Sequence, residues 1–467
     1  MSVKSENKSL TRAEKLRYQK KTVYEKAGEK IVREAYEYAN GYVKFLNTSK
    51  TEREAVAEGV RIAEAAGYRP WKFGDPMTVG DKLYYNNRGK NLFLFKIGTE
   101  PIENGIRITG AHIDSPRLDL KQNPVYEDHD LCFLKTHYYG GIRKYQWLAM
   151  PLALHGVVVK QSGEVVNVVI GENEGDPVMY ITDLLPHLAQ SQMTKTVTDA
   201  FQGEKLNILV GSRPLDGEEK DAVKLAALNY LYETYGITEE DLQSAELSVV
   251  PAGHARDVGF DRSMICAYGH DDRCCAYPSL TAMIDADETV HTTMCTLVDK
   301  EETGSDGVTG AQSSITIDLI GEIARALGGN VVAVRANSKC LSSDVSAIYD
   351  PNFPDVFEER NAAMLGCGVA MCKFTGARGK AGTSDASAEL VAWVRRCLNE
   401  AGVVWQTCEL GKVDLGGGGT IAKYMANQNI DTIDLGVGVL SMHAPYEVIS
   451  KVDLYESYRA FRAFYNF

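Results

Sequence analysis

The sequence TTMCTLVDKEETGSDG at residues 292–307 is the most informative part of the chain. It begins with apolar and β-prone residues, which predict a buried strand. The strand runs into Asp299, Lys300, Glu301 and Glu302, followed by a glycine-rich loop. Ligands of open α/β sheets lie beyond the carboxyl ends of the strands, and adjacent glutamates there repel each other unless a cation is near. The motif therefore predicts a metal held by one glutamate while the other carries protons, although alone it also fits a solvated acidic loop.

Strands and helices alternate around this stretch, which is typical of a mostly parallel, doubly wound sheet. We expect strands near 264–268, 292–298, 330–335, 366–373, 403–408 and 431–436. We expect helices near 273–286, 311–327, 384–401, 419–428 and 452–466. Upstream, helical spacing covers 9–66 with a break at 47–49, and 82–97 has the pattern of a hairpin.

The pattern changes between residues 118 and 251, where the expected strands are antiparallel. A hairpin is predicted at 152–170, a short helical or irregular segment at 181–194, and a helix at 218–235. The fold class is thus α/β, with a doubly wound mixed sheet interrupted by a β-rich insertion. We expect residues 1–117 and 252–467 to form one discontinuous catalytic domain, and residues 118–251 to form the inserted domain.

Composition excludes several classes of protein. The 467 residues are 44% hydrophobic and 24% charged, as in an ordinary globular protein. The net charge of −13 without a basic stripe argues against a nucleic-acid partner. No apolar run approaches the ~20 residues that span a bilayer, and residues 1–21 lack the apolar core of a signal peptide. The ten scattered cysteines predict reduced thiols and a cytoplasmic protein.

Four further motifs supply possible metal ligands: His112-Ile113-Asp114, Asp271-Asp272, Ser343-Asp344 and Met442-His443. Each has a structural alternative when taken alone. Asp272 fits a helix N-cap, Ser343-Asp344 fits a polar turn, and His443 fits a core histidine. Together they are more specific, because each follows an expected strand and the ends of such strands converge.

Five of these side chains form a candidate ligand set: His112, Asp271, Glu302, Asp344 and His443. Histidine and carboxylate ligands suit zinc, cobalt or manganese. Two divalent cations would balance the three carboxylates and a hydroxide, and such a pair both activates water and polarises a carbonyl. Glu301 would then move the proton from the water to a leaving amine, and Asp114 would orient His112. This chemistry is amide hydrolysis.

These motifs resemble those of the aspartyl aminopeptidase family of metalloaminopeptidases, which includes vacuolar aminopeptidase I. The resemblance spans nearly the whole chain and rests on GAHIDSP at 110–116, DDR at 271–273, DKEETGS at 299–305, Ser343-Asp344 and LSMH at 440–443. It implies a di-zinc exopeptidase fold and two divalent ions, by preference Zn²⁺ with Co²⁺ or Mn²⁺ as alternatives. It implies that Asp271 bridges the ions and precedes a cis peptide bond, and that Glu301 is the general base.

The resemblance also assigns the insertion and the substrate contacts. It implies that the inserted domain drives dimerisation and that dimers assemble into a tetrahedral dodecamer. His187 would reach the active site of a neighbouring subunit, although it also fits a plain surface histidine. Lys373 would bind substrate, with Lys380 as the competing candidate. The substrates would be peptides with a free N-terminus.

The sequence departs from the family at one position of consequence. Family members commonly carry a histidine three residues after the aspartate that corresponds to Asp344, where this chain has Ala347. A strict preference for acidic N-terminal residues is therefore not expected. Two other functions remain open from the sequence: a catalytically silent assembly or cargo protein with the same fold, and an aminoacylase or carboxypeptidase of the same clan.

Overall fold

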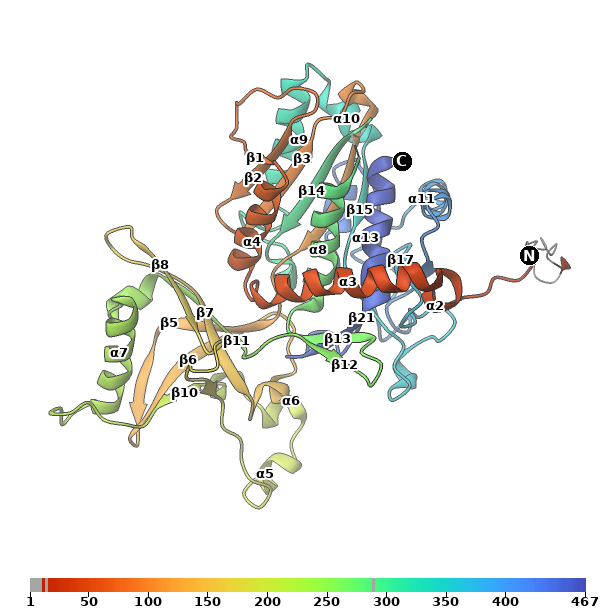
Figure 1. The fold of residues 1–467 in the computed structure, drawn as a ribbon. Helices are drawn as coiled ribbons and strands as arrows, with labels where there is room; N and C mark the ends of the chain where they lie inside the picture. The colour runs from red at the N-terminus through yellow and green to blue at the C-terminus, as the bar shows by residue number, and fades with distance from the viewer. Residues whose placement is uncertain (1–10, 13–15, 288–289) are drawn as a thin grey trace, which may run out of the picture.

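The computed structural model describes residues 11–12, 16–287 and 290–467 (Figure 1). The predicted N-terminal helix, 9–66, lies partly outside these residues. Within them it contains the helices α2 (Val23–Lys26), α3 (Gly28–Asn47) and α4 (Glu52–Ala65). The break falls where predicted, because Thr51 caps α4 by accepting from the backbone N–H of Glu54.

A nine-stranded mixed sheet forms the centre of the larger part of the molecule. Its strands in spatial order are β1 (Arg69–Pro70), β2 (Lys82–Asn87), β3 (Asn91–Lys96), β14 (Thr292–Val298), β4 (Ile106–His112), β15 (Lys339–Ser342), β19 (Asp431–Gly436), β17 (Val369–Cys372) and β18 (Trp405–Thr407). The four central strands, from β14 to β19, are mutually parallel, and β3 and β17 flank them in antiparallel orientation.

The register of the central strands places their carboxyl ends together. Val298 pairs with His112, and Ser342 pairs with both Gly110 and Asp434. The loops that leave β14, β4 and β15 therefore begin at one edge of the sheet, where ligands of such sheets bind.

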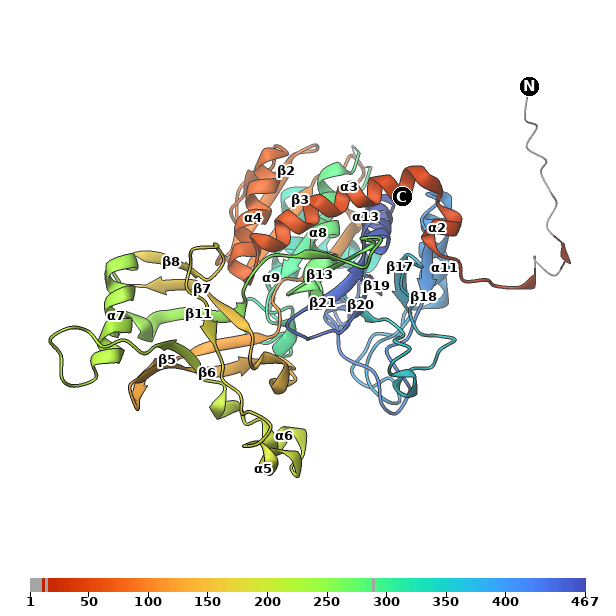
Figure 2. The same cartoon turned by 60° about the horizontal axis from the view of Figure 1, so that its bottom comes forward.

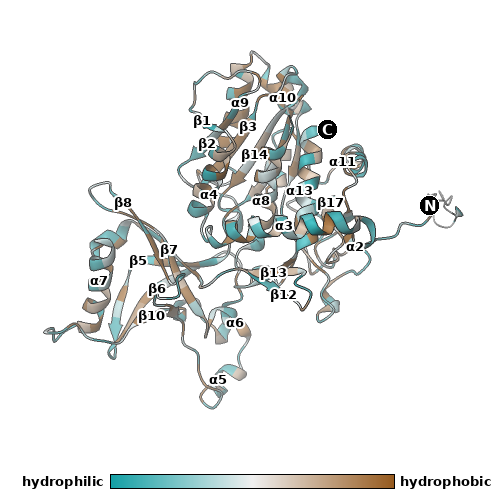
Figure 3. Ribbon diagram, viewed as in Figure 1, coloured by the Kyte–Doolittle hydropathy of each residue, from teal (hydrophilic) through white to brown (hydrophobic). Residues whose placement is uncertain are grey.

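Helices cover both faces of this sheet. One face packs against α3, α4, α8 (His270–Asp285), α11 (Ala388–Glu400) and α13 (Lys451–Asn466). The other face packs against α9 (Ile315–Ala326), α10 (Val331–Asn337) and α12 (Ala422–Ala426). The central strands are largely apolar, whereas the outer side of α3 is largely polar (Figure 3). Leu94 faces the first group and Phe93 the second, as alternation along a strand requires.

The prediction of a strand at 330–335 is wrong. The β-branched run at 331–334 lies in α10, whose N-terminus is capped by the Asn330 side chain at 2.9 Å from the Val332 nitrogen. The strand that precedes Ser343-Asp344 is instead β15, which is only four residues long. Local β-propensity was overridden by the cap and by tertiary packing.

A separate five-stranded sheet corrects a second expectation. Its order is β12 (Arg256–Val258), β13 (Met264–Ala267), β21 (Glu447–Ser450), β20 (Gly438–Leu440) and β16 (Ser346–Ala347). The strand before Asp271 and the strand before His443 belong to this sheet and not to the large one. The site therefore forms where two sheets meet.

The third sheet contains seven strands from residues 117–251 and lies to one side of the central sheet in both views (Figures 1 and 2). Its order is β11 (Ala245–Pro251), β5 (Arg117–Asp128), β6 (Leu131–Tyr139), β10 (Ile208–Gly211), β9 (Met179–Tyr180), β7 (Pro151–Val159) and β8 (Val165–Ile170). All its pairings are antiparallel, and β11 also pairs with β7, which closes the sheet. It has its own hydrophobic core.

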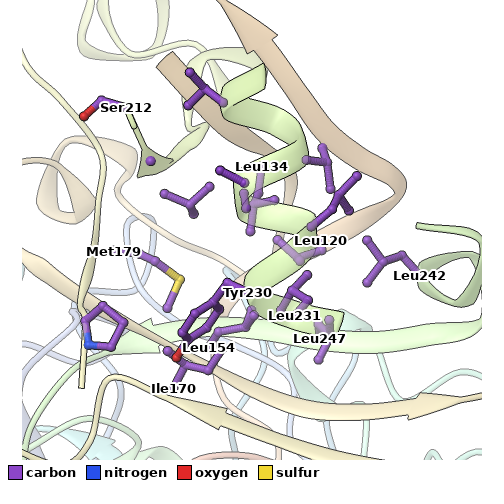
Figure 4. Close-up of a pocket in the computed structure, with 18 of the residues that line it drawn as sticks. Leu120, Leu134, Leu154, Ile170, Met179, Ser212, Tyr230, Leu231, Leu242 and Leu247 are labelled. Atoms are coloured by element: carbon purple, nitrogen blue, oxygen red, sulfur yellow. The ribbon is translucent and has the colours of Figure 1, made fainter. Parts of the chain in front are cut away.

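Helix α7 (Ala222–Tyr235) packs over this closed sheet, where a helix was predicted at 218–235. Between helix and sheet lies an apolar cavity of about 450 Å³, lined by residues such as Leu134, Leu154 and Leu231 (Figure 4). The segment predicted at 181–194 is irregular except for α5 (Gln190–Met193), and α6 (Val197–Ala200) follows it. No helix among the described residues is long and apolar enough to cross a membrane.

Candidate functional site

The first candidate ligand, His112, is the last residue of β4 and is almost fully buried. Its Nδ1 lies 3.0 Å from the carbonyl oxygen of Asp114 and 3.2 Å from Asp114 Oδ1. An N–H at Nδ1 donates to these oxygens, which leaves Nε2 free to act as a ligand. Nε2 points to Asp271 Oδ1 at 3.2 Å.

The second histidine, His443, is oriented in the same way from the other side. It follows β20 with a left-handed backbone (φ 64°), and its backbone N–H donates to Glu447 Oε1 at 2.7 Å. Its Nδ1 donates to the carbonyl oxygen of Gly141 at 2.9 Å. Its Nε2 lies 3.2 Å from Asp271 Oδ2 and 3.6 Å from Glu302 Oε2.

Asp271 thus lies between the two imidazoles, with one oxygen directed to each. It is the second residue of α8, and its peptide bond to Asp272 is cis, as the resemblance implies. Glu447 Oε2 accepts the Asp271 backbone N–H at 3.0 Å, and the Ser115 hydroxyl donates to the Asp271 carbonyl oxygen at 2.6 Å. These two contacts fix the backbone of Asp271 on both sides of its Cα and so position its carboxylate.

Glu301 and Glu302 occupy a short 3₁₀ turn, residues Glu301–Thr303, directly after β14. Their backbone N–H groups donate to Asp114 Oδ1 and Oδ2, each at 3.2 Å. The Glu301 side chain retains 18% exposure and lies 4.0 Å from His112 Nε2, whereas the Glu302 side chain is 3% exposed. The Glu301 side chain is therefore partly open to solvent, whereas the Glu302 side chain is enclosed.

Asp344 lies close to His112 and Asp272, with ligand atoms of all three within 4.8 Å of one another. A second group with the same spacing is formed by His112, Asp271 and Glu302. All five candidate ligands are thus brought into one neighbourhood. Asp272 is fully buried, and its Oδ2 accepts the His112 backbone N–H at 3.2 Å, so its side chain is not a simple helix cap.

The electrostatics of the cluster reflect an excess of buried negative charge. Burial raises the pKa of Glu301 to about 7, and Asp114 and Asp271 add to the shift. Burial and the neighbouring Asp271 raise the pKa of Glu302 well above its ordinary value. Burial disfavours the charged form of His443, but its hydrogen bond to Asp271 and the charge of Glu302 outweigh this and raise its pKa to about 10. A cation among these groups would relieve the repulsion.

The residues fit divalent metal ions. The Oε1 atom of Glu302 and the Oδ1 atom of Asp272 are buried without a hydrogen-bond partner among the described residues. Zinc bonds of about 2.0–2.1 Å in a tetrahedral site hold ligand atoms roughly 3.3 Å apart. The 3.2 Å separations from Asp271 to the two Nε2 atoms match that spacing.

Three residues of the site were not predicted from the sequence, and two of them, Tyr139 and Glu447, have no local sequence signal. Tyr139, at the end of β6, donates to Asp114 Oδ2 at 2.8 Å. Glu447, at the start of β21, binds the backbones of both Asp271 and His443. Gly141 supplies the carbonyl for His443. The pair Gly140-Gly141 after a strand is a general signal for close backbone approach, and a Cβ at Gly140 would lie 3.2 Å from that of Glu302.

The candidate substrate residues are less well connected. Lys373 and Lys380 both bind the carboxylate of Asp385, Lys380 at 2.8 Å. His187 is exposed on the irregular segment before α5. Within the described part of the chain, no hydrogen bond or ion pair joins any of these three side chains to the cluster.

Comparison with known proteins shows the family to which the chain belongs. Residues 45–465 match the family model of the Aminopeptidase I zinc metalloproteases (M18). A probable M18 family aminopeptidase 1 from Clostridium acetobutylicum is 51% identical over 455 residues, covering 96% of this chain and 98% of that protein. The Thermotoga maritima protein of the same description is 46% identical over 433 residues, covering 91% and 95%.

Solved structures agree as well. The crystal structure of the M18 aminopeptidase from Thermotoga maritima superposes with a TM-score of 0.92 at 44% identity, covering 96% of this chain and all of that one. Aminopeptidase I from Clostridium acetobutylicum gives 0.90 at 49% identity, covering 97% and 100%. The S. cerevisiae mApe1 dodecamer shares the fold, with a TM-score of 0.76 at 22% identity, over 93% of this chain and 97% of that one. This chain is a member of the M18 family of zinc metalloaminopeptidases.

Proposed function

We propose that this aminopeptidase removes N-terminal residues from peptides at a centre for two divalent cations, by preference Zn²⁺. His112, Asp271, Glu302, Asp344 and His443 would hold them. The observation that carries the proposal is the position of Asp271, whose two oxygens each lie 3.2 Å from a different histidine Nε2. A carboxylate placed in this way suits a bridge between two ions. Bound there, the cations would polarise a carbonyl oxygen and lower the pKa of a water molecule.

Glu301 is the proposed proton carrier. Its side chain is more exposed than those of Glu302 and Asp271, at 18% against 3% and 4%. A water molecule and the leaving amine can therefore reach it. It would accept the proton from the attacking water and return it to the amine nitrogen.

Asp114 is proposed to position both the ligands and the base. Its carboxylate accepts hydrogen bonds from His112 Nδ1, from the Tyr139 hydroxyl and from the backbone N–H groups of Glu301 and Glu302. Such supporting contacts fix the tautomer and the ring orientation of a ligand histidine.

We further propose the predicted division into a catalytic part, residues 1–117 and 252–467, and an inserted dimerisation part, residues 118–251. Support comes from the closed third sheet and its separate core. Gly141 of the inserted part contributes its carbonyl to His443, so the insertion also completes the site.

A homo-oligomer follows as a proposal from the fold shared with the mApe1 dodecamer. A tetrahedral dodecamer with His187 acting in a neighbouring active site is its specific form. The exposure of His187 and its lack of a partner within the described chain fit a contact made between subunits. Lys373 or Lys380 would contact substrate, and the ten free cysteines fit a cytoplasmic location.

A panel of peptides tests the activity. Free-amine dipeptides and their N-acetylated counterparts would be offered to the metal-loaded and the chelated protein. We expect cleavage of free-amine peptides alone, lost on chelation and restored by Zn²⁺, Co²⁺ or Mn²⁺. Cleavage of the N-acetylated series would instead indicate an aminoacylase or carboxypeptidase. Because Ala347 replaces a histidine, we expect neutral N-terminal residues to be accepted besides acidic ones.

A further inference from the structure

Cys372 and Cys408 lie side by side at the edge of the central sheet. Strands β17 and β18 are parallel, and their last register pair is Met371 with Thr407. The Cys408 backbone N–H continues the ladder by donating to the Met371 carbonyl at 3.0 Å. The next register position therefore sets Cys372 opposite Cys408.

The two thiols also point to the same side of the sheet. Both belong to one small apolar cluster with Ile348, Ala363 and Ala370, and they are 7% and 4% exposed. Neighbouring strands are about 4.8 Å apart, and disulfides bridge Cα atoms separated by about 4.4–6.8 Å. A bond between these sulfurs thus needs little movement of the backbone.

The surroundings favour reaction at this pair. Cys408 follows β18, the edge strand, which has a neighbour on one side only and can open locally. A hydrogen bond with the Cys372 thiol and another with Ser346 lower the pKa of the Cys408 thiol. A lower pKa enlarges the fraction of thiolate, which is the reactive form.

The pair also lies at the base of two loops near the site. Cys372 directly precedes Lys373, and its Sγ contacts the Ser346 hydroxyl at 3.9 Å, two residues beyond Asp344. Cys408 begins the segment that reaches Gly418, whose carbonyl accepts the Gly376 backbone N–H. A bond here would tie together the starts of both loops.

We propose that Cys372 and Cys408 are a site of reversible oxidation, at which an intramolecular disulfide joins β17 to β18. Two S–H bonds break and one S–S bond forms. Two protons are released, and two electrons pass to a low-molecular-weight disulfide or a hydroperoxide. A dithiol reductant reverses the step. This site is independent of the proposed peptidase chemistry.

Peptide mapping of the whole metal-loaded protein tests the proposal. After mild treatment with oxidised glutathione, free thiols are alkylated and the protein is digested without reduction. We expect a cross-linked peptide containing Cys372 and Cys408, about 2 Da lighter than the two reduced peptides together and absent after dithiothreitol. Absence of this peptide, including the case where only mixed disulfides with glutathione form, would overturn the proposal.

Thermal unfolding gives a second readout. A disulfide constrains the unfolded chain, so oxidation should raise the Tm of the wild type reversibly. Cys408→Ser should abolish the rise, whereas Cys266→Ser, which changes the least buried of the ten cysteines, should retain it. An equal rise in Cys408→Ser would contradict the assignment. If Cys408→Ser does not fold, the peptide map of the wild type decides alone.

Discussion

Asp114 accepts a hydrogen bond from the backbone N–H of Glu301 at 3.2 Å, although the two residues are 187 positions apart in the chain. The carboxylate of Asp114 is fully buried, and its second oxygen holds the next residue, Glu302, at the same distance. The loop after β14 is therefore fastened to the loop after β4. These contacts fix the direction in which two side chains project, those of Glu301, the proposed base, and Glu302, the proposed ligand.

Replacement of Asp114 tests this arrangement. Asp114→Asn would set an NH₂ group against backbone donors or the Tyr139 hydroxyl, so the glutamate loop should shift. We expect kcat/KM to fall by about 10–100-fold. Tyr139→Phe is the matched control, because it removes a single donor and should cost much less. Equal losses in the two variants would show that the backbone contacts contribute little.

Asp271 should control metal content. In Asp271→Asn the charge between the two histidines is lost, and we expect elemental analysis to find markedly less metal bound than in the wild type. Asp306→Asn, which changes an exposed carboxylate of the same loop region as Glu301, should retain wild-type content. Undiminished metal in Asp271→Asn would be incompatible with a bridging role.

Gly140 should be needed for close approach to Glu302. Its φ is +74°, and a Cβ there would meet the Glu302 Cβ at 3.2 Å and its Oε2 at 3.3 Å. We expect Gly140→Ala to lower stability by about 1 kcal/mol from the backbone strain and also to reduce turnover. Gly163→Ala provides the comparison, because Gly163 has φ +87° in a hairpin turn with open space around it. It should lose similar stability and keep full activity, and a parallel loss of activity would refute the role of Gly140.

The buried carboxyl group of Asp434 should make the stability of the protein depend on pH. Burial raises its pKa from 3.8 to about 7, although hydrogen bonds with Thr420 and Ser342 oppose the shift. Because the folded state binds this proton more tightly than the unfolded state does, the protonated carboxyl group contributes to stability. This contribution is complete below the pKa of Asp434 in the unfolded state and is lost as the pH rises towards 7. The slope is at most about 1.4 kcal/mol per pH unit.

Asp434→Asn removes this titration and keeps an oxygen that can accept from Ser342. Chemical unfolding between about pH 4.5 and 7 should therefore show that the wild type loses stability relative to the variant as the pH rises. Parallel stability curves for the two proteins would contradict the prediction.

Much of the fold was predictable from local patterns. The buried strand at 292–298, the break before Thr51 and most helices after residue 270 were found from periodicity and caps. The helix at 331–337 was missed because its β-branched residues mimic a strand, and the true strand, β15, is too short to show a period. The pairing of β13 with β21 was missed because an antiparallel contact between segments far apart in the chain leaves no local trace.

The residues of the candidate site likewise fall into those that local sequence predicts and those that it does not. Residues next to strand ends, such as His112, Glu301 and Glu302, carry a sequence signal because chemistry and position coincide there. Tyr139 and Glu447 carry none, since their roles arise only when β6 and β21 are packed beside the cluster. The roles of His187 and Lys373 depend on partners outside one chain, so they stay predictions.

The most direct test is the turnover of Glu301→Gln at full metal content. The amide is nearly the same size as the carboxylate but cannot carry the proton, so we expect unchanged bound metal and a kcat reduced by roughly 10²–10⁴-fold. Glu302→Gln, measured beside it, should instead lose metal. If Glu301→Gln binds the full complement of metal and its kcat stays within about threefold of the wild type, the assignment of Glu301 as proton carrier is wrong.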